Sequence, residues 1–329
     1  MERVPAHVVT AADRASFKRC RRAWDLGART RRNLEPRRTP RVDLGAAIAE
    51  ALEVHRFPGM WAWDRSIVAP LVNAALERAF DRQQDAGASV TAADRRDSAR
   101  LIEAYAAFAA PLDDFEPVQV SGQAEALLPH PARPGRGLEI DGTEVRYRAR
   151  LTAVVVDSAR RHWLLTDRVA TGSWAHPDSL VLDEASVAAC WAWQHEHLDV
   201  RFCGVIHDEL RPDLLDAAEA GVSPCFRRTR IRHHPTEIAR MGDRLGAEAL
   251  AMFATGLALY PTPAAHCETC AFRAPCLAME AGDEPSAMLE DDYRVHELPA
   301  EPEPRLGNPT WSMGRGAAPP TFGRRRRDR

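Results

Sequence analysis

Four cysteines have a spacing that could hold a metal centre. Near the end of the chain, Cys267, Cys270 and Cys276 form a C-x2-C-x5-C motif, and Cys20 lies near the beginning. Four thiolates can bind either a zinc ion or a [4Fe-4S] cluster, and the spacing alone does not choose between them. The set can act together only if the fold brings the two ends of the chain side by side.

The remaining sequence favours a reduced, cytoplasmic protein. Cys190, Cys203 and Cys225 lie in apolar or unpatterned stretches and are expected to be ordinary buried side chains. A chain of 329 residues can build a core without disulfides. No charged and then apolar leader opens the sequence, and no segment reaches the ~20 apolar residues of a membrane span. We therefore expect reduced thiols and no membrane partner.

Positive charge is concentrated in the first part of the chain. The net charge is -3, and nearly all cations are arginine, with Lys18 the only lysine. Residues 14–41 hold a dense group of these cations, a density that suits contacts with phosphates. A solvated helix face is the alternative interpretation of this pattern.

Apolar periodicity and capping residues predict a helical first third. Thr10 and Asp13 mark a helix start. Phe17, Cys20 and Trp24 then share one helical face. Further helices are predicted at residues 43–55, 63–84 and 92–110.

The pattern then changes to that of a mixed α/β core. Predicted elements are strands at 118–128, 143–157, 162–167 and 201–210, a helix at 183–198 before the last strand, and an amphipathic helix at 236–255. Turn residues at 141–142 and 158 predict hairpins between strands. The crossover through a helix predicts that the last strand is parallel to its neighbour.

Composition and element type divide the chain into five segments. They are an N-terminal cysteine-containing basic segment at 1–41, a helical region at 42–115, an α/β core at 116–235, a C-terminal helix with the cysteine motif at 236–296, and a basic tail at 297–329 that is expected to be disordered.

Several motifs together resemble one nuclease family. They are SFKRCRRAWD at 16–25, RNLEP at 32–36, the helix containing Gly45, YPTP at 260–263 and HCETCAFRAPC at 266–276. With these motifs the chain resembles the RecB-like, CRISPR-associated exonucleases, and more narrowly their actinobacterial and actinophage members, over residues 8–295.

The resemblance implies a fold, a cofactor and an activity. The fold would be the PD-(D/E)XK, restriction-endonuclease-like mixed sheet, with added N-terminal helices and a C-terminal cysteine region. Cys20, Cys267, Cys270 and Cys276 would hold a [4Fe-4S] cluster, with zinc as the alternative. The activity would be metal-dependent cleavage at DNA ends.

The expected catalytic positions depart from the family pattern. The Gly-x3-His, Gly-Arg-Leu-Asp, Asp-His-Lys-Thr-Ala and Gln-x3-Tyr motifs place the catalytic groups on Ala49, Thr152, Thr166 with Arg168, and Ala185 with Ala189. Phosphodiester cleavage with Mg²⁺ or Mn²⁺ needs carboxylate oxygens around the metal. Threonine is a poor substitute, and a permanently protonated arginine cannot act as a base.

Other residues could replace the lost metal ligands. Asp157 and Asp167 are the foremost candidates, and Glu125, His55 and the run at 207–209 are further ones. Each of them has a simpler interpretation as a structural or surface residue.

Three functional hypotheses follow. The leading one is a catalytically degenerate nuclease relative that binds DNA, as single strands or ends, or acts as a scaffold. The alternatives are an exonuclease with relocated ligands for Mg²⁺ or Mn²⁺, and a protein-partner module of an active paralogue. The expected DNA contacts are Arg21, Arg22, Arg31, Arg32 and Arg168, with the tail arginines 324–327 as a nonspecific addition.

Overall fold

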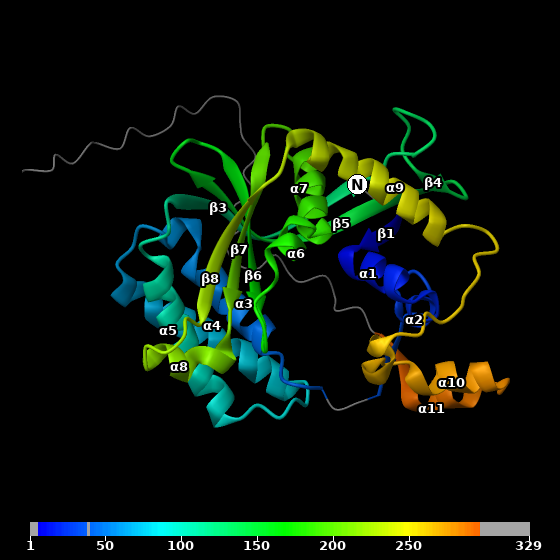
Figure 1. The fold of residues 1–329 in the computed structure, drawn as a ribbon, viewed down its shortest axis with the longest axis horizontal. Coiled ribbons are helices and arrows are strands. Elements are labelled where there is room, and N and C mark those ends of the chain that lie inside the picture. The colour runs from blue at the N-terminus through cyan, green and yellow to red at the C-terminus, as the bar shows by residue number, and fades with distance from the viewer. Residues whose placement is uncertain (1–5, 38–39, 297–329) are drawn as a thin grey trace, which may run out of the picture. The chain divides into compact units, whose positions relative to one another are not determined.

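A mixed seven-stranded sheet carries the described part of the chain. The structure is a computed structural model that describes residues 6–37 and 40–296 (Figure 1). The strands of the sheet are β1 (Ala6–Thr10), β3 (Phe115–Leu127), β4 (Glu139–Ile140), β5 (Thr143–Asp157), β6 (His162–Val169), β7 (Phe202–Leu210) and β8 (Phe226–Arg232).

The strand connections confirm the predicted order. β3 pairs antiparallel with β5, β5 pairs antiparallel with β6, and β6 pairs parallel with β7. The crossover between the two parallel strands contains α6 (Pro177–Val181) and α7 (Glu184–Glu196). A parallel pair needs such a long crossover, whereas the antiparallel strands β5 and β6 are joined by a short turn between Asp157 and His162. The protein is therefore an α/β protein in which the four predicted strands, β3, β5, β6 and β7, follow one another in the predicted order, with the predicted helix before the last of them.

Three helices pack together on one side of the sheet. They are α3 (Leu44–His55), α4 (Arg65–Asp85) and α5 (Ala92–Ala109), close to their predicted bounds (Figure 1). Asp43 and Thr91 cap the first and last of these helices, as their side chains accept hydrogen bonds from backbone N–H groups. Ile48, Phe80 and Leu101 are almost completely buried in their shared core.

A second core lies between the sheet and the helices α7 and α9 (Pro235–Met252). Trp24, Tyr147 and Trp191 are among its most deeply buried side chains. Helix α9 presents Met241 and Leu245 to this core, in agreement with its predicted amphipathic pattern. The two cores hold the central strands between two layers of helices.

The predicted N-terminal helix is two helices. α1 (Ala11–Arg19) begins with a capping box in which Thr10 and Asp13 exchange hydrogen bonds. Cys20 is extended and separates α1 from α2 (Arg21–Gly27). Because of this break, Cys20 and Trp24 enter different apolar clusters instead of sharing one face.

The two ends of the described chain meet in a small two-stranded sheet. β2 (Leu34–Pro36) pairs antiparallel with β9 (Tyr293–Val295), which follows α10 (Arg273–Ala281) and α11 (Ser286–Asp292). The backbone N–H of Arg22 also donates to the carbonyl of Tyr260. These contacts bring the N-terminal cysteine close to the C-terminal cysteine motif, which the sequence-based hypothesis requires.

Three strands of the main sheet were not predicted from the sequence. β1 and the short β4 both pair with β5, and β8 pairs with β7. β8 has the sequence FRRTRIR, whose charged residues conceal its alternation. Among the described residues, no helix is long and apolar enough to cross a membrane. The residues described up to Val295 belong to one compact unit, and the tail at 297–329 lies outside the described residues.

The close packing of α9 allows a test of the fold. A Cβ atom at Gly246 would lie 2.1 Å from the carbonyl oxygen of Pro129, so Gly246→Ala forces backbone segments apart. We expect the variant to lose roughly 1–3 kcal/mol of unfolding free energy, despite the better helix propensity of alanine. Urea denaturation measures the loss, with Ala247→Ser on the exposed side of the same helix as the control. An equal stability of both variants would contradict this packing.

Candidate functional site

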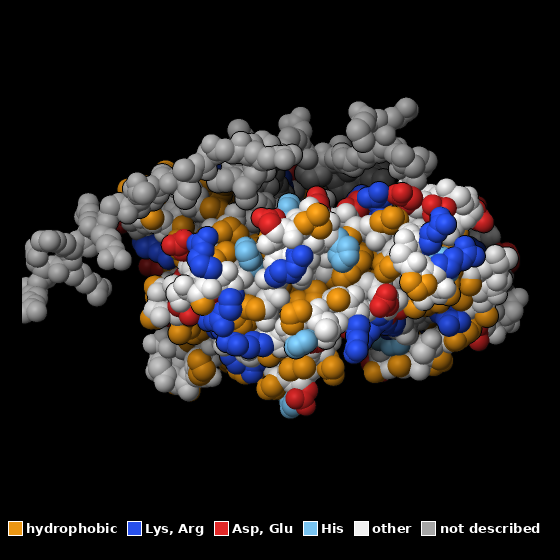
Figure 2. Space-filling view, turned by 90° about the horizontal axis from the view of Figure 1, so that it is seen from above, with side chains coloured by type: hydrophobic (Ala, Val, Ile, Leu, Met, Phe, Trp, Pro, Cys, Tyr) orange, Lys and Arg blue, Asp and Glu red, His pale blue; other side chains and the backbone are white. Residues whose placement is uncertain are grey.

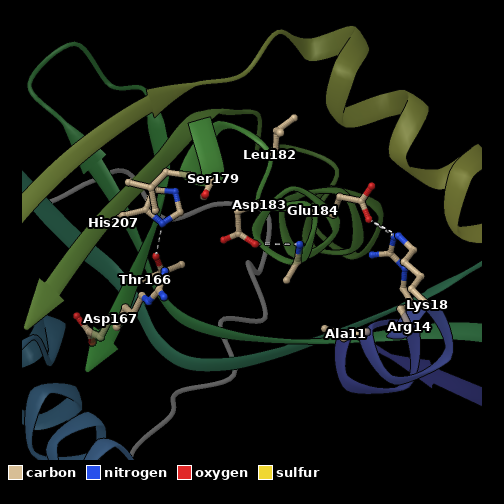
Figure 3. A pocket seen from close by; sticks show the side chains of 14 residues that line it. Ala11, Arg14, Lys18, Thr166, Asp167, Ser179, Leu182, Asp183, Glu184 and His207 are labelled. Atoms are coloured by element: carbon tan, nitrogen blue, oxygen red, sulfur yellow. Dashed lines mark hydrogen bonds and ion pairs between the residues drawn. The ribbon is translucent and has the colours of Figure 1, made fainter. Parts of the chain in front are cut away.

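One pocket collects several of the positions singled out in the sequence. It has a volume of about 520 Å³ and lies between α1, the end of β6, the start of α7 and β7 (Figure 3). Thr166, Arg168 and Ala185 line it. In the resemblance, Thr166 stands at a carboxylate position, Arg168 at a lysine position and Ala185 at a glutamine position. The fold brings these three degenerate positions together.

The other degenerate positions do not line this pocket. β5 and β6 run antiparallel, and Ala153 on β5 pairs with Leu165 on β6. One residue further in this register, Thr152 falls opposite Thr166. Ala49 lies half-buried on α3, and Ala189 is buried within α7. None of these three side chains carries a carboxylate or an imidazole.

The carboxylate of Asp167 is bound by an arginine. Arg56 Nη1 lies 2.5 Å from Asp167 Oδ2, and Arg56 Nη2 lies 2.7 Å from Asp167 Oδ1. Only 3% of the Arg56 side chain and 5% of the Asp167 side chain are exposed. Figure 3 shows the carboxylate pointing away from Thr166 and His207, as expected because neighbouring side chains alternate between the faces of a strand.

This ion pair is part of a larger buried network. Arg56 donates to the hydroxyl of Tyr105 at 2.6 Å, and that hydroxyl donates to Asp208 at 2.5 Å. Arg228 binds both oxygens of Asp208 at 2.7 Å and Asp113 at 2.8 Å. Burial raises the pKa of Tyr105 far above its ordinary value, so the phenol remains a neutral donor. Both carboxylate oxygens of Asp208 are therefore also engaged in hydrogen bonds of this network.

Asp183 serves as the cap of helix α7. Its Oδ1 accepts hydrogen bonds from the backbone N–H groups of Ala185 at 3.1 Å and Ser186 at 3.4 Å. Its Oδ2 accepts from the Ser186 hydroxyl at 2.5 Å. Such a cap satisfies N–H groups that lack a partner within the helix. Asp183 lines the pocket, but its carboxylate already has a structural role.

Glu184, the third acidic residue of the pocket, is surrounded by cations. It accepts hydrogen bonds from Arg14 at 3.0 Å, from Arg244 at 2.9 Å, and from Lys18. Arg14 and Lys18 also pair with Glu248. Burial acts to raise the pKa of Glu184, but the hydrogen bond from Lys18 and the surrounding charges outweigh it and lower that pKa.

Arg168 differs from the other charged residues of the pocket. Its side chain is exposed, and no ion pair or hydrogen bond joins it to the described residues 6–37 and 40–296. All three acidic side chains of the pocket, in contrast, are held by arginine, lysine or helix N–H groups. The pocket therefore offers a free guanidinium and no free carboxylate.

Thr166 and His207 form the polar floor of the pocket. The Thr166 hydroxyl lies 3.1 Å from His207 Nδ1 and 3.5 Å from the carbonyl oxygen of Ile206 (Figure 3). Burial lowers the pKa of His207, so its ring is neutral at pH 7. His207 Nε2 is buried without a partner in the described residues.

Asp157, a candidate relocated ligand, lies at the other end of β6. Its carboxylate accepts hydrogen bonds from the backbone N–H of Ala159 at 3.0 Å and of Arg161 at 2.9 Å, from Arg161 Nε at 2.8 Å, and from Trp163 Nε1 at 3.0 Å. Burial opposes ionisation, but these hydrogen bonds lower its pKa well below the ordinary value. Asp157 closes the β5–β6 turn, and it does not line the pocket.

The further candidate ligands are also engaged. Glu125 pairs with Arg148 at 2.8 Å, and Glu209 with Arg227. His55 is buried beside Arg65, and burial followed by this charge lowers its pKa to about 3. His55 is therefore neutral and contributes no charge to metal or phosphate binding.

The expected DNA contacts fall into two groups. Arg31 and Arg32 both pair with Asp25, at 2.6 and 3.5 Å. Arg22 is turned inward, where it pairs with Glu280 at 2.6 Å. Arg21 and Arg168 form no carboxylate pair within the described chain; the Arg21 guanidinium instead lies over the rings of Phe17 and Tyr260.

The cysteine motif and Cys20 share one neighbourhood. Cys20 and Cys270 belong to the same small apolar cluster. Arg22 Nη1 lies 3.8 Å from Cys276 Sγ, and Cys267 Sγ lies 4.0 Å from the carbonyl oxygen of Thr262. All these cysteines are free thiols, as are Cys190, Cys203 and Cys225.

The spacing of these thiols bears on the identity of a bound group. Zinc needs its thiolates about 2.3 Å away, so that four sulfurs crowd around one point. Among residues 6–37 and 40–296, no three His, Cys, Asp or Glu side chains are arranged to hold a metal ion. A [4Fe-4S] cluster bonds its four thiolates through different iron atoms, so its sulfurs stand farther apart. Cys20, Cys267, Cys270 and Cys276 are the residues that would hold either group.

Comparisons with known proteins assign no family. No protein-family model matches the sequence. No curated protein matches it either. Among solved structures, the one titled "Crystal structure of SSO0001" is similar with a TM-score of 0.31 and 11% sequence identity, over 74% of this chain and 88% of that chain. This similarity is distant and carries no functional argument.

The buried network predicts a large cost for removing one charge. Arg56→Met leaves the Asp167 carboxylate buried without its counter-ion, so we expect a loss of roughly 3–5 kcal/mol in unfolding free energy. Urea denaturation measures the loss. The control is Arg82→Met, which removes an exposed pair with Glu50 and is expected to cost less than about 1 kcal/mol. Similar losses in both variants would show that burial does not govern the Arg56 pair.

The hydrogen bonds of Asp157 predict a pH-dependent contribution to stability. Because its pKa is lower in the folded state, the contribution is fully present above the unfolded pKa of about 3.9 and decreases as the pH falls below it. We expect Asp157→Asn to be less stable than the wild type at pH 7, by an amount that shrinks toward pH 2. Glu116→Gln, at an exposed position of β3, should show no such change. A stability difference that is independent of pH would exclude ionisation of Asp157 as its cause.

Proposed function

We propose that this protein is a cleavage-deficient relative of the RecB-like PD-(D/E)XK nucleases that binds single-stranded DNA or DNA ends. One observation carries the proposal. In the pocket where the degenerate positions Thr166, Arg168 and Ala185 meet, each acidic side chain is engaged, and the exposed guanidinium of Arg168 has no partner among residues 6–37 and 40–296. These positions were inferred from the resemblance, and the mixed α/β sheet places Thr166 and Arg168 on β6 and Ala185 on α7.

The lack of cleavage follows from the ligand requirement of Mg²⁺. This ion prefers oxygen ligands and usually takes one or two carboxylates from a nuclease or polymerase site. Asp167 is bound by Arg56, and Asp157 closes a turn away from the pocket. Metal binding at either residue would have to break several hydrogen bonds in a buried or structural site, so relocation of the metal is disfavoured.

The binding of DNA is supported by a local rather than a global positive charge. The net charge of the chain is -3. On the face drawn in Figure 2, Lys and Arg side chains form several separate groups among apolar and acidic ones. Arg168 in the pocket and Arg21 beside Tyr260 have no carboxylate partner in the described residues. A few phosphate contacts at a strand or an end match this distribution better than a long duplex footprint.

We include a [4Fe-4S] cluster at Cys20, Cys267, Cys270 and Cys276 in this proposal. When bound, the cluster would cross-link the N-terminal helices to the C-terminal segment. The shared neighbourhood of Cys20 and Cys270 and the pairing of β2 with β9 support this role.

A scaffold function is the second candidate, because α4 exposes an apolar stripe. Ile67 and Leu71, four residues apart on one side of α4, are 56% and 42% exposed, and Trp63, which precedes the helix, is 50% exposed. A protein partner could cover this stripe. Co-purification of a stable partner that is lost on Ile67→Glu, without any DNA affinity of the protein, would favour this function.

The proposed DNA binding is tested with anaerobically purified protein of known iron content and end-labelled single- and double-stranded DNA. We expect a mobility shift that weakens with salt, persists in EDTA, and leaves the DNA intact with Mg²⁺ or Mn²⁺. Removing one phosphate contact by Arg168→Gln should weaken binding and reduce the salt slope by about 1. Arg78→Gln, at an exposed position of α4, is the control.

Two results would contradict the proposed function. Metal-dependent degradation that disappears in Asp167→Asn would show a rebuilt active site. The absence of any shift at low salt, with correctly folded protein, would contradict DNA binding.

A further inference from the structure

We propose that the pocket binds a nucleotide phosphate directly, without a metal ion, through the Thr166 hydroxyl and the Arg168 guanidinium. This inference rests on the proposed function and specifies the ligand chemistry of the same site. Both residues line the pocket and lie near the C-terminal end of strand β6. Both are hydrogen-bond donors, and phosphate oxygens are acceptors.

The position of the Thr166 hydroxyl is set by His207. The neutral His207 ring has one N–H, which can reside on Nδ1 or on Nε2. Nε2 is buried without a partner, and a buried N–H without an acceptor is costly. The hydrogen is therefore placed on Nδ1, from which it is donated to Thr166 Oγ1 over 3.1 Å.

This arrangement leaves the hydroxyl hydrogen of Thr166 available. Its acceptor in the structure is the carbonyl oxygen of Ile206, at the long distance of 3.5 Å. A phosphate oxygen in the pocket could accept the same hydrogen at a shorter distance, because O–H···O bonds to charged oxygens are ordinarily about 2.5–2.7 Å long. His207 is thus a positioning residue for a donor that faces the ligand.

The charges around the pocket favour an anion over a cation. Glu184 is surrounded by Arg14, Lys18 and Arg244. The carboxylate of Asp167 is turned to the other face of the sheet (Figure 3). The guanidinium of Arg168 is the charged group of the described pocket that has no partner, and it can bind phosphate with two hydrogen bonds.

The residue types explain why no metal is required. A carboxylate at position 166 would repel a phosphate, and a divalent cation would be needed between the two anions. A hydroxyl at this position removes the repulsion and supplies a donor. A guanidinium at position 168 supplies the positive charge. The same substitutions that remove metal binding therefore create a direct phosphate site.

The size and the walls of the pocket indicate that the ligand is larger than phosphate alone. Its volume of about 520 Å³ is within the ordinary range of small-molecule sites, about 300–1,000 Å³. Leu180, Leu182 and Ala11 add apolar surface. A nucleoside monophosphate unit matches these features, whether it is a free nucleotide or the end of a DNA strand.

The first experiment is calorimetry of the full-length protein in EDTA with thymidine 5′-monophosphate, thymidine and inorganic phosphate. We expect the nucleotide to bind at least 10-fold more tightly than thymidine, and inorganic phosphate to bind more weakly than the nucleotide. Competition by a 5′-phosphorylated oligothymidylate against the free nucleotide then distinguishes a strand end from a free nucleotide. Thymidine binding equal to that of the nucleotide would overturn the phosphate assignment.

The decisive variant is Thr166→Asp, which restores the negative charge. In EDTA it should bind the nucleotide at least 10-fold more weakly than the wild type, and Mg²⁺ should restore part of the loss. Thr166→Ser should retain most of the affinity, and Thr166→Val should lose part of it in a metal-independent way. Thr143→Asp, at the start of β5 outside the pocket, is the matched control. Wild-type affinity of a folded Thr166→Asp variant in EDTA would overturn the proposal.

The role of His207 is tested by two amides. Asparagine places its side-chain nitrogen near the position of Nδ1, whereas glutamine reaches the position of Nε2. We expect His207→Asn to retain more nucleotide affinity than His207→Gln, at similar thermal stability, with thymidine binding equally weak in both. The reverse order would refute positioning through Nδ1.

The outcomes separate this inference from the proposed function. Nucleotide binding that depends on Thr166, without any DNA binding, supports the pocket and contradicts the DNA function. DNA binding that is unaffected by Thr166→Asp and is not displaced by the nucleotide supports the DNA function and overturns the pocket assignment.

Discussion

The buried ion pair between Arg56 and Asp167 is the interaction on which the arrangement of the site depends. Burying two charges is costly, and only close pairing with further hydrogen bonds compensates for it. Here the compensation comes from a hydroxyl on α5 and from Asp208 and Arg228 on β7 and β8. The end of α3 is thereby tied to three strands of the sheet and to α5. A metal ion at Asp167 would compete directly with this network, so the fold of this chain opposes metal binding at that carboxylate.

The same strand presents a different chemistry on its other face. Successive side chains of β6 point to opposite sides, so the Asp167 carboxylate turns to the buried network while Thr166 and Arg168 line the pocket. The two environments are separated by one residue. The groups of the buried network and the groups that line the pocket can therefore be changed independently of one another.

Much of the fold could be predicted from the sequence, because the strongest patterns are local. Thr10, Asp43 and Thr91 mark helix starts through hydrogen bonds to residues three positions away. The partners of Arg56, in contrast, are 49 and 111 residues away, and no local pattern identifies them. β8 was missed because its arginines pair with carboxylates on β7 and before β3. In a chain with so many arginines, sequence alone does not distinguish those that bind carboxylates from those that remain free. Arg22 shows this limit, since the sequence gives no sign of its contacts with Glu280 and Cys276.

The pocket and the cysteine neighbourhood are joined by one short helix. α1 carries Arg14 and Lys18, which form the cationic wall of the pocket, and it ends at Cys20. Arg14 is 4% exposed and holds Glu184 of α7 and Glu248 of α9, so α1 is fixed to both helices by buried charge pairs. A displacement of Cys20 must be absorbed either by the extended backbone at Cys20 itself or by these ion pairs. Because the extended backbone at Cys20 separates α1 from α2, a small displacement of Cys20 can leave α1 in place. A larger displacement of Cys20 must shift α1 and with it the cationic wall of the pocket. Helix α1 therefore links the position of Cys20 to the cationic wall of the pocket.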